Sequence, residues 1–185
     1  NESSGDELDL GAAAAADGIR LDANRSLFAI DGALNLYDGQ WLLPSPLNDL
    51  LPIPVESLTR GNHAIWLQGA GRLYRYAEPE LLELSLNDNS EIRRLVTGPN
   101  GLVAIAIPEL IVVDSLQKPF VIADHRMDLP VAAMAIDKRN SLWVSTGDSH
   151  LHQRAGDGQW RSLNHDSAIV NLQANSLSGD LWLQT

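Results

Sequence analysis

Short apolar runs recur at a nearly constant interval along this chain. Five of them can be aligned on their central residues, which are Phe28, Trp66, Ala104, Trp143 and Trp182. The differences between these residue numbers are 38, 38, 39 and 39. A fixed period of this length is typical of a repeated supersecondary unit, and the runs are too short for helices. The pattern therefore predicts five copies of one β unit.

Each unit carries further short segments around this central strand. A first strand is expected at 18–21, 55–58, 92–96, 131–136 and 169–172, and a third at 33–37, 72–76, 110–113 and 150–153. A fourth is expected at 41–43, 82–86, 120–122 and 160–163, and two of these begin with the same tetrapeptide, Asp-Gly-Gln-Trp. Four strands in about 40 residues correspond to one propeller blade. We therefore predict an all-β fold, a β-propeller with four complete four-stranded blades and the first two strands of a fifth.

The blades must stack, because one sheet cannot bury both of its faces. The aromatic residue of the second strand (Phe28, Trp66, Trp143 or Trp182) is expected to pack between neighbouring blades, and Ala104 is the exception. The predicted blades are 17–54, 55–91, 92–130, 131–168 and 169–185, and residues 1–16 form an acidic, alanine-rich tail.

The fifth unit ends after two strands, so we expect the chain to be part of a larger propeller of about six to eight blades. Closure of the ring by a second copy is the alternative. An open sheet edge offers unpaired backbone groups, so self-association or a protein partner is expected there.

Charge and cysteine content argue against several kinds of partner and site. The chain has 24 acidic and 13 basic residues, a net charge of −11, which repels phosphate backbones and argues against nucleic acid. It has no cysteine, which removes disulfides, thiolate zinc sites and cysteine nucleophiles. No apolar run reaches the roughly 20 residues of a membrane helix, so membrane contact would need segments outside this sequence. No cofactor is predicted.

The sequence from 136 to 147, Ile-Asp-Lys-Arg-Asn-Ser-Leu-Trp-Val-Ser-Thr-Gly, resembles the two-component-regulator propeller repeat. Residues 179–185 resemble its second half, and residues 63–69 are a looser copy. The resemblance implies a periplasmic or extracellular sensor portion of a bacterial signalling protein, although a cytoplasmic location also fits the composition. It indicates a non-enzymatic ligand-sensing or binding module. The alternatives are an enzyme propeller, of lyase or glycoside-hydrolase type, and a protein-interaction scaffold.

Ligands of propellers usually bind where blade loops converge over the central channel. The loops after the second and fourth strands should meet at one rim, and they contain the polar groups of mixed chemistry. We expect a small-molecule or glycan ligand to contact Asp124, His125, Arg126, His165, Asp166, Asp148 and Gln68. His150 and His152 share one face of a strand but lack an identifiable third ligand, so no metal site is predicted. No catalytic constellation is predicted either.

Overall fold

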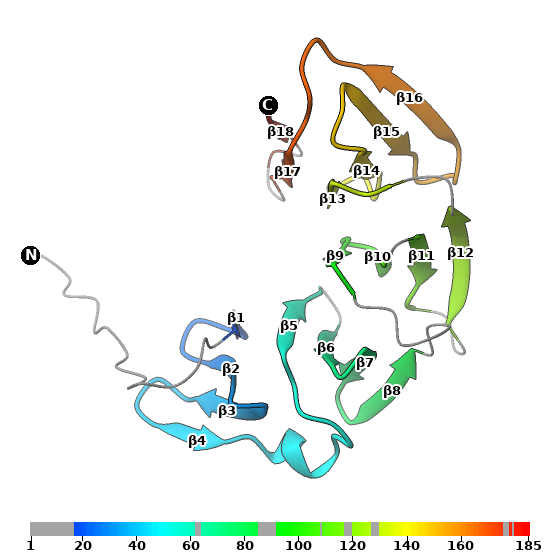
Figure 1. Cartoon of the computed structure of the whole chain (residues 1–185). Coiled ribbons are helices and arrows are strands. Elements are labelled where there is room, and N and C mark those ends of the chain that lie inside the picture. The colour runs from blue at the N-terminus through cyan, green and yellow to red at the C-terminus, as the bar shows by residue number, and fades with distance from the viewer. Residues whose placement is uncertain are drawn as a thin grey trace, which may run out of the picture.

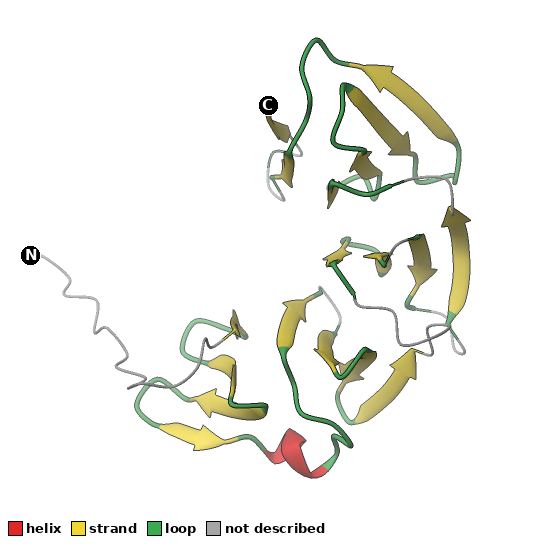
Figure 2. Ribbon diagram, in the orientation of Figure 1, coloured by secondary structure: helices red, strands yellow, loops and turns green. Residues whose placement is uncertain are grey.

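The computed structural model describes residues 17–61, 64–84, 92–107, 109–116, 120–126, 130–175, 178 and 180–185. Within these ranges every regular element is a β-strand, apart from one short 3-10 helix, η1 (Pro46–Asp49). The strands form four four-stranded sheets and one strand pair (Figure 1, Figure 2). The tail expected at 1–16 lies outside the described residues.

The sheets follow one another along the chain, and each is a meander of consecutive antiparallel strands. Blade 1 contains β1 (Asp17–Arg20), β2 (Ser26–Ile30), β3 (Ala33–Tyr37) and β4 (Leu42–Pro44), and blade 2 contains β5 (Ser57–Arg60), β6 (Ile65–Gly69), β7 (Arg72–Ala77) and β8 (Glu80–Leu84). Blade 3 contains β9 (Arg94–Thr97), β10 (Leu102–Ala106), β11 (Leu110–Asp114) and β12 (Val121–Arg126). Blade 4 contains β13 (Ala133–Ile136), β14 (Leu142–Ser145), β15 (His150–Arg154) and β16 (Trp160–Asn164), and the partial blade 5 contains β17 (Asn171–Ala174) and β18 (Leu181–Gln184).

The blades are arranged in an open arc. Figure 1 shows the first strand of each blade on the concave inner side and β4, β8, β12 and β16 on the outside. Each inner strand contacts the next, from β1 through β5, β9 and β13 to β17. The predicted all-β propeller of four complete blades and two strands of a fifth is confirmed.

Four apolar clusters between successive blades form the core. Trp66 packs with Val103 and Ile105 between blades 2 and 3, and Ala104 packs with Met134 and Leu142 between blades 3 and 4. The other two clusters lie between blades 1 and 2 and between blades 4 and 5. Side chains alternate along a strand, so each blade shows one face to each neighbour.

The turn between the first and second strands sets the register shared by all blades. There the backbone N–H groups of Leu21, Gly61, Gly98, Asp137 and Asn175 donate to the oxygens of Arg25, Ala64, Leu102, Ser141 and Asp180, respectively. Two positions after each acceptor stand Leu27, Trp66, Ala104, Trp143 and Trp182.

The predicted inter-blade role of Phe28 is therefore wrong by one residue. Leu27 packs with Leu58 between blades 1 and 2, whereas Phe28 lies over Gly18 on the opposite face of blade 1. A shift of one residue turns a side chain to the other face of a sheet. Because Leu27–Ile30 is apolar at every position, the sequence pattern could not show which residue faces which neighbour.

The two Asp-Gly-Gln-Trp segments also take different registers. In blade 4 the turn closes between Ala155 and Gln159, so Trp160 pairs with Arg154 and packs toward blade 3. In blade 1 the turn is one residue shorter, so Leu42 takes the place of Trp160. Trp41 points to the other face and is 61% exposed.

Candidate functional site

The loops after the second and fourth strands meet at one rim, here called the loop rim. In blade 4 the N–H of His165 donates to the oxygen of Ser149 at 2.8 Å, and the N–H of Ile169 donates to the oxygen of Asp148 at 2.9 Å. In blade 1 the N–H of Val55 donates to the oxygen of Gly32 at 2.9 Å. The backbone thus holds both sets of loops together, as expected for antiparallel four-stranded blades.

Asp148 is the organising side chain of the loop rim in blade 4. Its Oδ1 accepts hydrogen bonds from the Thr146 hydroxyl at 2.5 Å and the His150 backbone N–H at 2.8 Å, and its Oδ2 lies 2.9 Å from His150 Nδ1. The Thr146 hydroxyl, followed by the His150 backbone N–H and ring, holds the pKa of the Asp148 carboxyl well below its ordinary value. Asp148 therefore remains a carboxylate near neutral pH.

The backbone of His165 lies beside Ser149, the residue between Asp148 and His150. The ring Nδ1 of His165 lies 3.2 Å from both the backbone nitrogen and the backbone oxygen of Ser167, and it accepts from the N–H in the tautomer that carries the proton on Nε2. The next residue, Asp166, is exposed. We call Asp148, His150 and His165 the imidazole patch.

A second imidazole, that of His152, lies two residues farther along β15, away from the rim. The rings of His150 and His152 stack with centroids 6.5 Å apart, and His152 Nδ1 lies 2.8 Å from the Ser162 hydroxyl. Within the described ranges no three histidine, aspartate or glutamate side chains come close enough together to hold a metal ion.

The prediction of a loop at Asp124, His125 and Arg126 is wrong, because these residues belong to the outer strand β12. The strand stays paired with β11 through a register shift between Val112 and Val113, which the sequence pattern does not show. Neighbouring residues therefore point to opposite faces.

Asp124 and Arg126 face blade 4. The Asp124 carboxylate accepts from the Trp160 indole N–H and lies 3.4 Å from Arg154 Nε. The Arg126 guanidinium carbon lies 5.2 Å from the centroid of the Trp160 ring, a cation–π contact. This network joins the outer strands of blades 3 and 4, and ligand contact by these residues stays a prediction.

His125 points the other way and is hydrogen-bonded through Nε2 to the carboxylate of Glu109, in the loop after β10. Both side chains are partly exposed. The acid has the same place along the repeat as Asp148, and their residue numbers differ by 39. This recurring acid is a sequence signal that could have identified Glu109.

Gln68 has a structural role. Its side-chain amide donates to the oxygen of Ile92 at 3.2 Å, where blade 3 begins. Ser145 has the equivalent position in blade 4, and its hydroxyl donates to the oxygen of Ile169 at 2.5 Å. Both residues fasten the end of a second strand to the start of the next blade.

The opposite edge, formed by the turns after the first and third strands, is here called the turn rim, and it is hollowed. A groove of about 250 Å³ lies between blades 1 and 2, lined by Leu21, Arg60, Gly61, Ala64, Ile65, Tyr76, Ala77 and Glu78. Burial, followed by the negative charge of Glu78, raises the pKa of the Tyr76 phenol. Polar and apolar groups therefore share this groove, and no pattern in the sequence predicted it.

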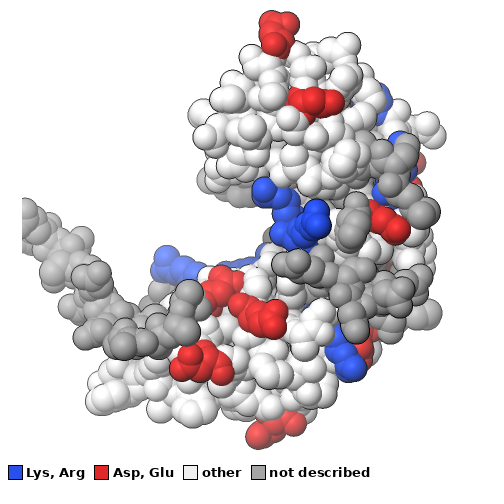
Figure 3. Space-filling model, viewed as in Figure 1, with Lys and Arg blue, Asp and Glu red and all other residues white. Residues whose placement is uncertain are grey.

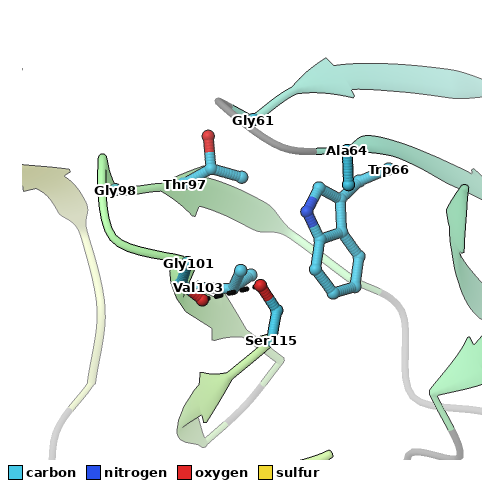
Figure 4. Close-up of a pocket in the computed structure, with 8 residues that line it drawn as sticks. All are labelled: Gly61, Ala64, Trp66, Thr97, Gly98, Gly101, Val103 and Ser115. Atoms are coloured by element: carbon cyan, nitrogen blue, oxygen red, sulfur yellow. Dashed lines mark hydrogen bonds between the residues drawn. The ribbon is translucent and has the colours of Figure 1, made fainter. Parts of the chain in front are cut away.

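A smaller hollow lies between blades 2 and 3, beside Trp66 and three glycines (Figure 4). In blade 4 the equivalent indole, Trp143 Nε1, donates to Asp137 Oδ2 at 3.0 Å. Gly61 occupies the place of Asp137 in blade 2, and a Cβ added there would lie 3.6 Å from Trp66 Nε1. The hollow thus lies where blade 4 has the Asp137 carboxylate.

We expect Gly61→Asp to raise the free energy of unfolding by about 1 kcal/mol, because it supplies an acceptor for the Trp66 indole. Gly61 does not have a left-handed backbone conformation. The nearest heavy atom to the new Cβ is the oxygen of Ala64, at 3.3 Å. Urea unfolding of Gly61→Asp and of the control Gly61→Ala measures this. Equal stability of the two variants would show that the carboxylate contributes nothing.

Basic side chains gather at the inner side of the arc, whereas acidic ones are spread over the blades (Figure 3). The inner strands and the segments next to them carry six exposed basic residues: Arg20, Arg60, Arg93, Arg94, Lys138 and Arg139. This local group of basic side chains contrasts with the net charge of −11 of the whole chain. An anionic group is therefore attracted toward the inner edge, which the total charge does not reveal.

Comparison with known proteins shows the fold. No family model matches the sequence, and no curated protein matches it. The structure is similar to the extracellular domain of the hybrid two-component system BT3049 from B. thetaiotaomicron, with a TM-score of 0.62, 18% identity and coverage of 91% of this chain and 25% of that one. It is also similar to the tricorn protease (TM-score 0.69, 14% identity, 91% and 18% covered) and to BamB from Moraxella catarrhalis (0.58, 17%, 91% and 55%).

The chain spans only part of the length of each of these proteins. Their sequence identities are low, so the likeness is one of fold. The β-propeller expected from the repeat is confirmed, and an extracellular domain of a hybrid two-component system is among the similar structures. The part of the chain that the structure describes contains no helix long and apolar enough to cross a bilayer.

Proposed function

We propose that this chain is a non-enzymatic ligand-binding module of a bacterial extracytoplasmic signalling protein, and that the imidazole patch binds a small polar molecule or glycan. The likeness to an extracellular domain of a hybrid two-component system supports the signalling context. The observation that carries the proposal is the combination of hydrogen-bonding groups in the patch.

The two rings of the patch offer opposite groups to a ligand. In the tautomer in which Nδ1 accepts from the N–H of Ser167, the Nε2–H of His165 is a donor. His150 Nδ1 lies against the Asp148 carboxylate and carries the proton, so its Nε2 is an acceptor in the neutral ring. A hydroxyl both donates and accepts, and a polyhydroxylated ligand therefore matches the pair.

Asp148 itself is unsuited to act as a general acid or base. A general acid or base works best when its pKa lies near the operating pH. The hydrogen bonds from Thr146 and His150 move the pKa of Asp148 away from that range, and they occupy both carboxylate oxygens. Asp148 therefore serves as a fixed support that orients His150.

Isothermal titration of the chain against a panel of neutral and acidic oligosaccharides tests the proposal. Loss of the hydrogen bonds in the double variant His150→Ala/His165→Ala should raise the dissociation constant of any bound glycan roughly tenfold or more. His152→Ala is the matched control, because His152 lies on the same strand face farther from the rim, and it should bind as the wild type does. Unchanged affinity in the double variant would exclude the patch, and turnover of the bound glycan detected by NMR would contradict a non-enzymatic role.

A further inference from the structure

One wall of the turn-rim groove between blades 1 and 2 is a row of three side chains in matched register. Arg60 of β5 pairs with Ile65 of β6, and Ile65 pairs with Tyr76 of β7. Directly paired residues of neighbouring strands lie on the same face of a sheet. Ile65 and Tyr76 pack against the apolar cluster between the two blades, and Leu21, which follows β1, completes the lining. The row therefore presents a cationic, an apolar and a phenolic group to blade 1, in that order.

Arg60 supplies the cationic group at the inner strand of blade 2. Its Nη1 donates to the backbone oxygen of Arg20 in blade 1, which holds the guanidinium across the gap between the blades. In the part of the chain that the structure describes, its Nε and Nη2 form no hydrogen bond. Those two groups form the edge of a guanidinium that binds a carboxylate through two parallel hydrogen bonds. The side chain of Arg20, in contrast, donates to the backbone oxygens of Asp22 and Ala23, both at 2.8 Å.

The end of the groove farther from β5 carries a hydroxyl and a carboxylate. Burial, followed by the negative charge of Glu78, raises the pKa of the Tyr76 phenol, so the phenol keeps its proton near neutral pH. An ammonium group has three donors, and both the Glu78 carboxylate and the phenol oxygen can accept from it. Within the described ranges Glu78 and Arg60 form no ion pair with each other, although both line the groove. Both charges are therefore available to a ligand.

We propose that this groove binds a small zwitterion whose carboxylate lies on Arg60, whose ammonium group lies on Glu78 and whose apolar chain lies along Ile65 and Leu21. Strands β5 and β7 are two strand spacings apart, each about 4.8 Å, so an α-amino acid, whose charged groups are adjacent, cannot lie along the whole row. The groove, of about 250 Å³, is smaller than the roughly 300–1,000 Å³ of sites for drug-sized ligands, which limits the chain length. An ω-amino acid such as ε-aminocaproate meets these requirements. The site lies on the rim opposite the imidazole patch and is independent of it.

Titration of the 185-residue chain with ε-aminocaproate, followed by NMR of the Ile65 methyl groups, tests the proposal. The Ile65 signals should shift and saturate at millimolar ligand. Caproate lacks the ammonium group and hexylamine lacks the carboxylate, so each should bind about tenfold more weakly, because one charged contact is lost. Absence of a saturable shift with ε-aminocaproate would overturn the proposal, as would equal affinity for all three compounds.

Two variants assign the ends of the ligand to their residues. Arg60→Gln should weaken binding of ε-aminocaproate about tenfold and leave that of hexylamine unchanged, whereas Glu78→Gln should weaken ε-aminocaproate and leave caproate unchanged. Arg139→Gln and Glu83→Gln are the matched controls, because both residues are exposed and lie outside the groove, and they should bind as the wild type does. A loss in a control as large as in Arg60→Gln or Glu78→Gln would show general charge attraction and refute the site.

Discussion

Replacing Trp66 with alanine is expected to lower the free energy of unfolding by about 3–5 kcal/mol, as truncation of a buried aromatic side chain does. The side chain is 1% exposed and packs between blades 2 and 3 with Val103 and Ile105. The ring of Phe120 lies 6.0 Å from it between centroids. Because both walls of the resulting cavity are hydrogen-bonded sheets, they can relax only slightly to fill it.

Urea unfolding followed by circular dichroism measures this loss. Trp41→Ala removes the same side chain from an exposed site and should change the unfolding free energy by less than about 0.5 kcal/mol. Equal losses in the two variants would show that Trp66 does not hold the blades together.

Replacing Asp137 with alanine is expected to cost about 2–4 kcal/mol, because it leaves three N–H donors without their acceptor. Asp137 is buried, and its Oδ1 accepts from the backbone N–H groups of Arg139 and Ser141 at 2.9 Å. Its Oδ2 accepts from Trp143 Nε1 at 3.0 Å. One carboxylate thus closes the turn before β14 and fixes the tryptophan that packs against blade 5.

Asp137→Asn separates these two roles. The amide oxygen can still accept from the turn, but its NH₂ group cannot accept from the indole, so an intermediate loss is expected. Asp157→Ala is the control, since Asp157 is an exposed turn residue that accepts from the N–H of Gln159. If Asp137→Ala were no less stable than Asp157→Ala, the capping role of Asp137 would be disproved.

The sequence predicted the strands and their repeat well because both depend on local patterning. Short apolar runs and turn residues locate each strand, and the period identifies the blade. The orientation of side chains depends on turn lengths that differ by one residue, as between the Asp38–Trp41 and Ala155–Gln159 turns. The sequence does not show those lengths, so Phe28 was assigned to the wrong face.

The candidate site was predicted less well, because polar residues have the same composition in loops and in outer strands. Asp124 and Arg126 were read as rim ligands, but long-range pairing of β12 with β11 directs them toward Trp160 of the next blade. Gln68 was read in the same way and bonds to Ile92, and its ligand contact stays a prediction. Asp148 and His165 lie on one rim as expected, since the loops there follow directly from the strand order, and their ligand contact also stays a prediction.

Hydrogen exchange of the individual indole N–H groups, followed by NMR, tests the stacking of blades through defined faces most directly. We expect slow exchange for Trp143, which donates to Asp137 within blade 4, and for Trp160, which donates to Asp124 of blade 3, and fast exchange for the exposed Trp41. Trp41 and Trp160 end identical tetrapeptides, so only their different registers can separate their rates. Equal exchange rates for Trp41 and Trp160 would contradict the stacking of blades through defined faces.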